Sequence, residues 1–402
     1  MNPVFKFFSS LWLTVVLLAF CILLVFFGTL DQVHWGIHET QRRYFESLYV
    51  FWQYPLEWPK GQALRWIHLP LPGGYTLGSL LLINLVCAHF RFFRPGWKRL
   101  GIAVTHLGVV ILLVSGFLIS AFQKESQMWI KQGETSNYAT DYRANELVVI
   151  DRSHPDYDEV TTIPESLLAE EGIISLNELG LRVRVIDFMP NALLASKMQN
   201  PTGPDPRADR GAAARMGMFA IEQPQVYAED EVNTTSAIVE LIGPDGSLGT
   251  WLVSNYMDQP GIPAQTFELN GKTYELMLRF HRTYLPFSLQ LDEFSHDVYP
   301  GTETPKNFSS EVQIITPGES GTQPALIYMN HPLRHEGYTF FQHSFRDARM
   351  TPDQIPWTSL QVVQNPVWQM PYYAVAIVGI GMCIQFLIRL VGFANRFKKA
   401  AA

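Results

Sequence analysis

Cysteine is scarce in this sequence of 402 residues, and each of its three copies, Cys21, Cys87 and Cys383, falls inside an apolar run. No cysteine lies between residues 123 and 371, so a disulfide framework is excluded from that large polar segment. The absence of a Cys-x-x-Cys pair also excludes a thioredoxin-like thiol carrier and a covalent c-type haem protein. We therefore interpret the three thiols as buried and structural.

Catalytic motifs are missing as well. The sequence has no glycine-rich phosphate loop, no His-Glu-x-x-His and no serine-hydrolase elbow. The residues therefore do not indicate catalysis by this chain alone, and whether it serves an enzyme as a non-catalytic subunit stays open.

Four long apolar runs dominate what the sequence does contain. They lie at residues 11–27, 77–90, 101–122 and 372–391, and none contains Asp, Glu or Lys. A helix needs about 20 residues to cross about 30 Å of hydrocarbon. We predict three transmembrane helices in residues 1–122, at about 11–30, 75–93 and 100–122, and a fourth in residues 372–402, which also hold a basic tail. The first is interpreted as an uncleaved anchor in the lipid bilayer.

Basic residues next to these runs predict the orientation. The loop between the second and third runs and the tail after the fourth carry Lys and Arg without any acid. Short cytoplasmic loops carry such an excess, so both termini are expected in the cytoplasm and residues 123–371 outside it. The basic residues are Arg91, Arg94, Lys98 and Arg99 in the loop and Arg396, Lys398 and Lys399 in the tail.

The segment between the third and fourth runs is acidic and rich in predicted strands. Residues 121–371 hold 33 Asp and Glu against 17 Lys and Arg, which argues against nucleic acid as a partner. Short β-branched or aromatic runs bounded by turn residues predict a mainly-β extracytoplasmic domain over 123–371. A loop or disordered insertion at 199–214 is expected to split it into two lobes. The predicted strands include 146–151, 181–188, 237–242, 273–280, 287–291 and 338–341.

Histidine placement is the clearest chemical signal in the apolar runs. His106 lies about six residues into the third predicted helix, and His89 lies close to the end of the second. An ionisable group at membrane depth is costly and suggests function, and neutral imidazole is a ligand of haem iron. Both are candidate cofactor-binding residues, and His106 is the candidate metal ligand. An interhelical hydrogen bond, to a carbonyl or to a neighbour such as Asn84, is the alternative.

A second histidine group, His331, His335 and His343, lies in the predicted β domain. Its spacing does not establish a shared face, so a metal site there and three solvated or hydrogen-bonded side chains both stay open.

Three stretches, in order along the chain, carry a further signal. The first comprises residues 27–30 (FGTL), 44–47 (YFES), 83–87 (INLVC) and 106–116 in the membrane segments. The second comprises residues 299–302 (YPGT) and 305–312 (PKNFSSEV). The third comprises residues 330–333 (NHPL), 337–338, 341–342, 344–345, 360–362 and 365–366. Together with the order of three spans, one large domain and a closing span, they resemble the ResB (also CcsB) family of the system II cytochrome c biogenesis pathway.

The resemblance implies a multi-pass protein of the bacterial inner (cytoplasmic) membrane with its large domain on the periplasmic side. Such a protein would work with a CcsA (ResC)-type membrane partner to move haem across the membrane and present it to apocytochrome c. It would be a non-catalytic subunit of a haem–cytochrome c synthase complex, holding haem b transiently and sharing it with the partner.

The resemblance also gives His106 a role, because related fused proteins have a histidine at the matching position that helps to hold haem in the membrane. The second axial histidine is then expected from the partner. Gly101, Thr105, Gly108 and Ser115 follow helical spacing on the same predicted helix, and we expect a partner helix to approach closely there.

The rival interpretation is a membrane-tethered binding or sensor module, in which the helices only anchor a β domain that captures a ligand. It predicts no haem in the membrane part. A transporter subunit is a weaker alternative, because four spans without internal repeats offer little pathway.

Overall fold

The chain forms two compact units in a computed structural model that describes residues 2–401 except 56, 57, 59, 93–95, 156, 228–231, 259–261, 303, 304, 319 and 320. One, here called the membrane unit, comprises Met1–Lys124, Tyr227–Glu229 and Asn365–Ala402. The other, here called the β domain, comprises Glu125–Val226 and Asp230–Gln364.

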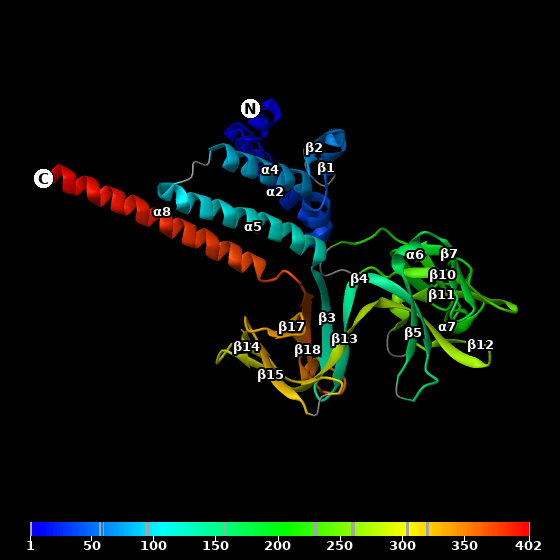
Figure 1. The fold of residues 1–402 in the computed structure, drawn as a ribbon. Coiled ribbons are helices and arrows are strands. Elements are labelled where there is room, and N and C mark those ends of the chain that lie inside the picture. The colour runs from blue at the N-terminus through cyan, green and yellow to red at the C-terminus, as the bar shows by residue number, and fades with distance from the viewer. Residues whose placement is uncertain are drawn as a thin grey trace. The chain divides into compact units, whose positions relative to one another are not determined.

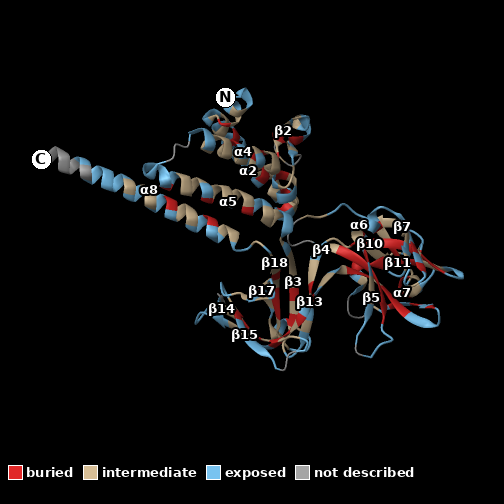
Figure 2. Cartoon of the chain, in the orientation of Figure 1, coloured by how far each residue is buried: buried red, intermediate tan, exposed pale blue. Residues whose placement is uncertain are grey.

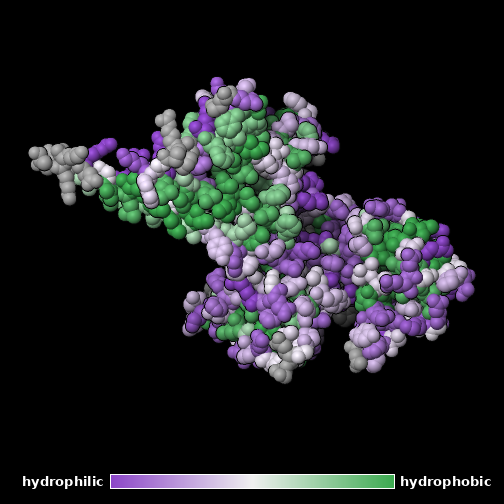
Figure 3. Space-filling model, in the orientation of Figure 1, coloured by the Kyte–Doolittle hydropathy of each residue, from purple (hydrophilic) through white to green (hydrophobic). Residues whose placement is uncertain are grey.

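The membrane unit is built on four helices that are long and apolar enough to span a membrane, counted over the described residues. They are α2 (Leu11–Thr40), α4 (Gly74–Phe92), α5 (Leu100–Phe122) and α8 (Met370–Ala401), visible in Figure 1. Their visible surface is largely hydrophobic, whereas hydrophilic residues dominate the visible face of the β domain (Figure 3). The predicted fold class, four membrane helices with a large mainly-β domain between the third and fourth, is confirmed.

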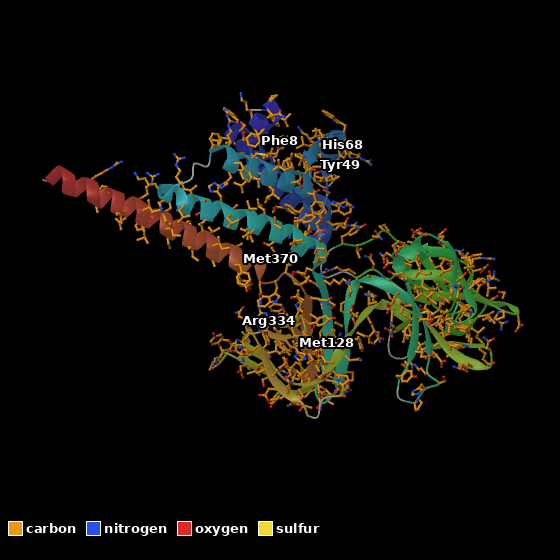
Figure 4. All side chains as sticks on the ribbon, viewed as in Figure 1. Phe8, Tyr49, His68, Met128, Arg334 and Met370 are labelled. Carbon is orange, nitrogen blue, oxygen red and sulfur yellow. The ribbon has the colours of Figure 1, made fainter. Side chains whose placement is uncertain are left out.

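Shorter elements complete the membrane unit. A short helix, α1 (Pro3–Phe8), precedes α2, and the connection from α2 to α4 holds β1 (Tyr49–Gln53), α3 (Gly61–Leu64) and β2 (His68–Pro72). Strands β1 and β2 pair as a hairpin, on which Figure 4 labels Tyr49 and His68.

Helix α2 continues past residue 30, the predicted end of the first membrane helix, because the carboxylate of Asp31, which follows, has hydrogen-bond donors within the membrane unit. The Asp31 carboxylate accepts hydrogen bonds from the Tyr44 hydroxyl at 2.7 Å and the Trp52 indole N–H at 3.1 Å. Gly36, at φ +63°, then kinks the helix before it ends at Thr40.

Helices α5 and α8 lie side by side (Figure 1), and their approach depends on glycine. A Cβ atom at Gly108 would lie 2.6 Å from Val378 Cγ2, and one at Gly101 would lie 2.5 Å from the Gln385 backbone nitrogen. The predicted close approach is therefore real, but the helix on this face is the chain's own α8. The expectation that a partner subunit occupies it is wrong, since spacing reveals a small-residue face and not the identity of its neighbour.

The β domain contains one large sheet and two smaller ones. The large sheet has ten strands in the order β15-β14-β13-β4-β3-β18-β17-β16, with β12 paired to β13 and β5 to β4. A four-stranded sheet has the order β11-β10-β7-β6, and β8 pairs with β9. Two short helices, α6 (Glu165–Ala169) and α7 (Gly211–Arg215), lie between strands. The strands are β3 (Lys124–Lys131), β4 (Thr135–Asp151), β5 (Glu159–Pro164), β6 (Gly172–Leu176), β7 (Leu181–Met189), β8 (Ala192–Ser196), β9 (Met218–Glu222), β10 (Ser236–Gly243), β11 (Gly246–Ser254), β12 (Gln265–Leu269), β13 (Lys272–Val298), β14 (Pro305–Ile315), β15 (Gln323–Tyr328), β16 (Leu333–His335), β17 (Tyr338–Arg346) and β18 (Trp357–Gln364).

Two main hydrophobic cores stabilise this domain, and both draw on β4 and β13. Leu147 and Leu276 belong to one core, whereas Ala139 and Leu289 belong to the other. Figure 2 shows the buried stretches along these strands. The structure differs here from the expected division at residues 199–214, because β7 and β10, on either side of that segment, pair in one sheet. The segment itself is packed, with Ala212 and Ala213 of α7 buried.

An ionic cluster holds β4 to β13 where these strands pass between the two cores. The Glu146 carboxylate accepts a hydrogen bond from Arg279 Nε at 2.9 Å, and its other oxygen lies 2.9 Å from His281 Nδ1. Glu146 and Arg279 are each only 2% exposed. A register shift between Phe280 and His281 marks the same place in the ladder.

The charge asymmetry of the sequence predicts a membrane topology, and this orientation gives a first testable prediction. In a variant with Cys21, Cys87 and Cys383 replaced by alanine, Met198→Cys is expected to react with a membrane-impermeant maleimide in intact cells. Trp97→Cys is expected to react only after permeabilisation. Both positions are open, at 89% and 82% exposed, so burial does not limit either reaction. Labelling of Trp97→Cys in intact cells would overturn the predicted orientation.

Candidate functional site

A stripe of residues on α5 faces α2 and α4 across a pocket. Arg99, which directly precedes α5, lines it, and so do Ile102, His106, Val109 and Leu113, which recur at intervals of three and four residues within the helix. Side chains with that spacing share one face of an α-helix. Gly101 and Gly108, which contact α8, lie on an adjoining face of α5, and Ile102 and His106 also line a smaller cavity with α8.

The pocket has a volume of about 730 Å³ and lies among α2, α4, α5 and α8 of the membrane unit. Its size is that of a cofactor or small-molecule site, for which about 300–1,000 Å³ is typical. The walls are mostly apolar, and the polar groups among them are few. Apolar lining residues include Leu18, Leu81, Leu85, Phe92, Val109 and Leu113.

The ring of His106 is oriented by its own helix. Nδ1 lies 2.7 Å from the backbone carbonyl oxygen of Ile102, one turn earlier. A carbonyl oxygen only accepts, so the proton is assigned to Nδ1 and the lone pair of a neutral ring to Nε2. Metal-binding histidines use this arrangement, because the outer hydrogen bond fixes the tautomer and the ring orientation. This hydrogen bond lies within α5, so Nδ1 of His106 does not form the interhelical hydrogen bond that was the alternative to a ligand role.

His89 of α4 and His106 of α5 come together in this pocket. Their ring centroids lie 5.8 Å apart, with 43° between the ring planes, and both side chains line the pocket. Metal–imidazole bonds are about 2.0–2.1 Å long, so two rings bound to opposite sides of one ion have centroids roughly 6 Å apart. The two residues that the sequence singled out separately therefore lie at a spacing compatible with one shared metal ion.

The donor set limits the kind of metal group that fits. Over the part of the chain that the structure describes, no three His, Cys, Asp or Glu side chains gather as metal ligands. Two imidazoles alone cannot complete a four-coordinate protein site. The residues fit a metal that brings its own equatorial ligands and an apolar body, which is the chemistry of haem with histidine axial ligands.

Asn84, the neighbour considered as a hydrogen-bond partner for the histidines, is engaged elsewhere. Its side chain is 1% exposed and lies between α4 and the start of α2. Nδ2 donates to the carbonyl oxygens of Phe8 at 2.7 Å and Ser10 at 3.0 Å, and Oδ1 accepts from the Thr14 hydroxyl at 2.6 Å. Asn84 thus ties α1, α2 and α4 together at the rim of the pocket.

The second histidine group is not assembled as a metal site. His331 stacks on Tyr328 and His335 packs edge-on against Phe287, each at 4.6 Å between ring centroids. His343 Nε2 lies 3.4 Å from Gln127 Nε2. The described residues around these three provide aromatic and amide neighbours rather than a shared ligand set.

The three thiols are placed differently from one another. Cys21 and Cys87 are half-buried in the helix bundle, whereas Cys383 is exposed on α8. The expectation that all three are buried is therefore wrong for Cys383. A helix face that meets lipid is apolar like a helix face in a protein core, so sequence alone does not separate them.

These features define a class: a multi-pass membrane protein with a large β domain and a histidine-lined pocket in its helix bundle. Comparison with known proteins then gives the family likeness. The ResB-like family model matches residues 264–354, from β12 through β17 of the β domain, and the resemblance seen in the sequence is confirmed over this segment. The matched segment does not include His89 or His106.

Two relatives show similarity over short stretches. Over 99 residues the chain is 32% identical to protein NrfI of Wolinella succinogenes, covering 24% of this chain and 10% of the relative. Over 107 residues it is 33% identical to the cytochrome c biogenesis protein CcsB of Synechococcus sp., covering 27% of this chain and 22% of the relative. The aligned stretches thus span about a tenth and about a fifth of these proteins.

Proposed function

We propose that this chain is a membrane subunit of a cytochrome c biogenesis machine and holds haem in its helix bundle. The ResB-like segment and the CcsB relative support the role in cytochrome c biogenesis. The observation that carries the haem proposal is that the imidazole rings of His89 and His106, with centroids 5.8 Å apart, line one mostly apolar pocket. Haem is cargo here, so the chain binds and presents it rather than transforming it.

In this proposal, His106 provides the principal iron ligand through Nε2, because Nδ1 is committed to the Ile102 carbonyl. His89, whose ring centroid lies 5.8 Å from that of His106, would contribute the second imidazole while the chain holds haem without its partner. A CcsA-type partner would then exchange one imidazole for its own during transfer of haem to apocytochrome c. The membrane is expected to be the bacterial inner membrane, with the β domain facing the periplasm.

Haem content of the purified full-length chain, alone and with a CcsA-type partner, tests the proposal. We expect a b-type absorbance spectrum in both, and His106→Ala should lower haem occupancy by roughly tenfold or more. Even outer-shell partners of a metal ligand contribute about 10–100-fold to affinity, and His106 is a direct ligand here. Imidazole added to His106→Gly should partly restore binding, because a small ligand fills the vacated position.

The matched control is His331→Ala, which removes an exposed histidine of the β domain and should leave haem occupancy unchanged. An unaltered spectrum in an inserted His106→Ala protein would contradict the ligand assignment. Absence of haem from the wild-type chain under every loading condition would favour the tethered binding module instead.

A further inference from the structure

Two arginines line the same pocket as the two histidines, and the haem proposal leaves them unexplained. Arg99 stands directly before α5, and Arg389 lies near the carboxyl end of the apolar part of α8. No acidic side chain lines the pocket, and neither guanidinium has an ion-pair partner among the described residues. Both side chains are exposed and border the pocket, so an acidic group of a ligand held in the pocket can reach them.

The arginines lie at one end of the pocket. Gln385 Nε2 donates to the Lys98 carbonyl oxygen at 3.4 Å, and the Gln385 backbone nitrogen faces Gly101 at the start of α5. Arg389 follows Gln385 by about one helical turn, so it lies level with Arg99. His106 comes seven residues after Arg99, roughly 10 Å further along the axis of α5.

We infer that Arg99 and Arg389 bind the two carboxylates of the haem propionates and thereby fix the direction in which haem enters the bundle. The inference rests on the proposed function and deepens it. The pocket then matches haem in three respects: apolar walls for the macrocycle, imidazoles for the iron and two guanidiniums for the two acids. Guanidinium is suited to the last task because its planar N–H donors bind carboxylates in pairs.

Arg389 also lines a second cavity next to His106, beside α8. This cavity of about 330 Å³ lies between α5 and α8, and both His106 and Arg389 line it. Arg389 therefore borders both spaces around the His106 ring. A propionate bound by Arg389 would lie on the same side of the bundle as the basic loop before α5, which directs the acidic edge of haem toward the predicted cytoplasmic surface.

Lipid phosphate is the other anion that these arginines could bind, and haem dimethyl ester separates the two possibilities. The ester keeps the iron and macrocycle but lacks both negative charges. Full-length protein in zwitterionic nanodiscs, free of anionic lipid, is titrated with haemin and with the ester. We expect wild-type protein to prefer haemin by roughly tenfold for each arginine, because hydrogen bonds to charged groups are worth that much.

Arg99→Gln and Arg389→Gln should each lose roughly tenfold in haemin affinity with little change for the ester, and the double variant should bind both alike. Arg→Lys at the same positions should keep part of the preference, because the charge remains. Arg91→Gln is the control, since Arg91 contacts the Lys6 carbonyl and Ser9 at the same end of the bundle but does not line the pocket.

The outcomes distinguish this inference from the proposed function. Wild-type protein that binds haemin and its ester equally, or Gln variants that keep the wild-type preference, would overturn the propionate assignment and leave haem binding intact. Wild-type protein that binds neither compound would overturn the proposed function, and the propionate assignment with it.

Discussion

Glu146→Ala is expected to lower the free energy of unfolding around β4 and β13 by about 3–5 kcal/mol, because it leaves Arg279 charged, buried and unpaired. Arg279 is 2% exposed, and its Nη2 lies 2.9 Å from the same Glu146 oxygen that Nε contacts. Its hydrogen bond to the Tyr284 hydroxyl at 3.3 Å cannot compensate a positive charge, and the nearby Asp258 carboxylate already pairs with Arg282 at 3.6 Å. Hydrogen exchange of β4 and β13 in the full-length protein should accelerate by at least about a hundredfold.

Glu240→Ala provides the matched control, since Glu240 pairs with Arg184 at 2.9 Å but the arginine is 49% exposed. Removal of a partner from such a surface pair should change stability by at most about 1 kcal/mol. The double variant Glu146→Leu/Arg279→Met should recover most of the loss, because it removes both buried charges together. A single Glu146→Ala variant as stable as Glu240→Ala would show that water reaches Arg279 and that the cluster does not secure the junction.

Local sequence pattern predicted individual strands well and their long-range arrangement poorly. Alternation in β7, with Leu181, Val183 and Val185 buried and Arg182 and Arg184 exposed, identifies a strand without further information. The same approach divided β13 into 273–280 and 287–291, because Arg282 and Thr283 interrupt the apolar run. That interruption is where β13 passes from one core to the other, which depends on pairing with β4 more than a hundred residues away.

The candidate site shows the same division between local and long-range information. The cost of an ionisable group in an apolar run singled out His106, and the position of His89 near a helix end made it the lesser candidate. Their proximity could not be predicted, because it depends on how α4 and α5 are rotated and staggered. The helical spacing of Ile102, His106, Val109 and Leu113 was visible in the sequence, and it identifies the face of α5 that lines the pocket.

Gly108→Leu is expected to separate α5 from α8 and to disturb the histidine pocket. A side chain at this position would meet Val378 Cγ2 at 2.6 Å and the Ala374 carbonyl oxygen at 2.9 Å, and a carbonyl in a helix cannot move aside cheaply. Overpacking typically costs about 1–3 kcal/mol and occasionally more. Here the loss should lie at the upper end, because no flexible side chain can absorb all of the overlap.

The consequence for function follows from the two faces of α5. Arg389 belongs to α8, so displacement of α8 removes this side chain from the pocket. The His106–Ile102 hydrogen bond lies within α5 and survives. If the haem proposal holds, Gly108→Leu should weaken haemin binding while keeping b-type spectra for the haem that remains. Loss of the iron ligand in His106→Ala would instead change the spectrum itself.

Gly116→Leu is the matched control on the same helix, because a Cβ atom at Gly116 would have nothing within 4 Å. Both substitutions add the same apolar side chain to the same membrane helix, so insertion and hydrophobicity change equally. Cysteine cross-linking between Thr105→Cys and Met382→Cys, which line the same cavity between α5 and α8, reports whether these helices stay together in a background without the three native cysteines. We expect cross-linking in detergent to persist in Gly116→Leu and to fall severalfold in Gly108→Leu. Equal cross-linking in the two variants would mean that the bundle tolerates a side chain at Gly108 and that the close approach of α8 is not required.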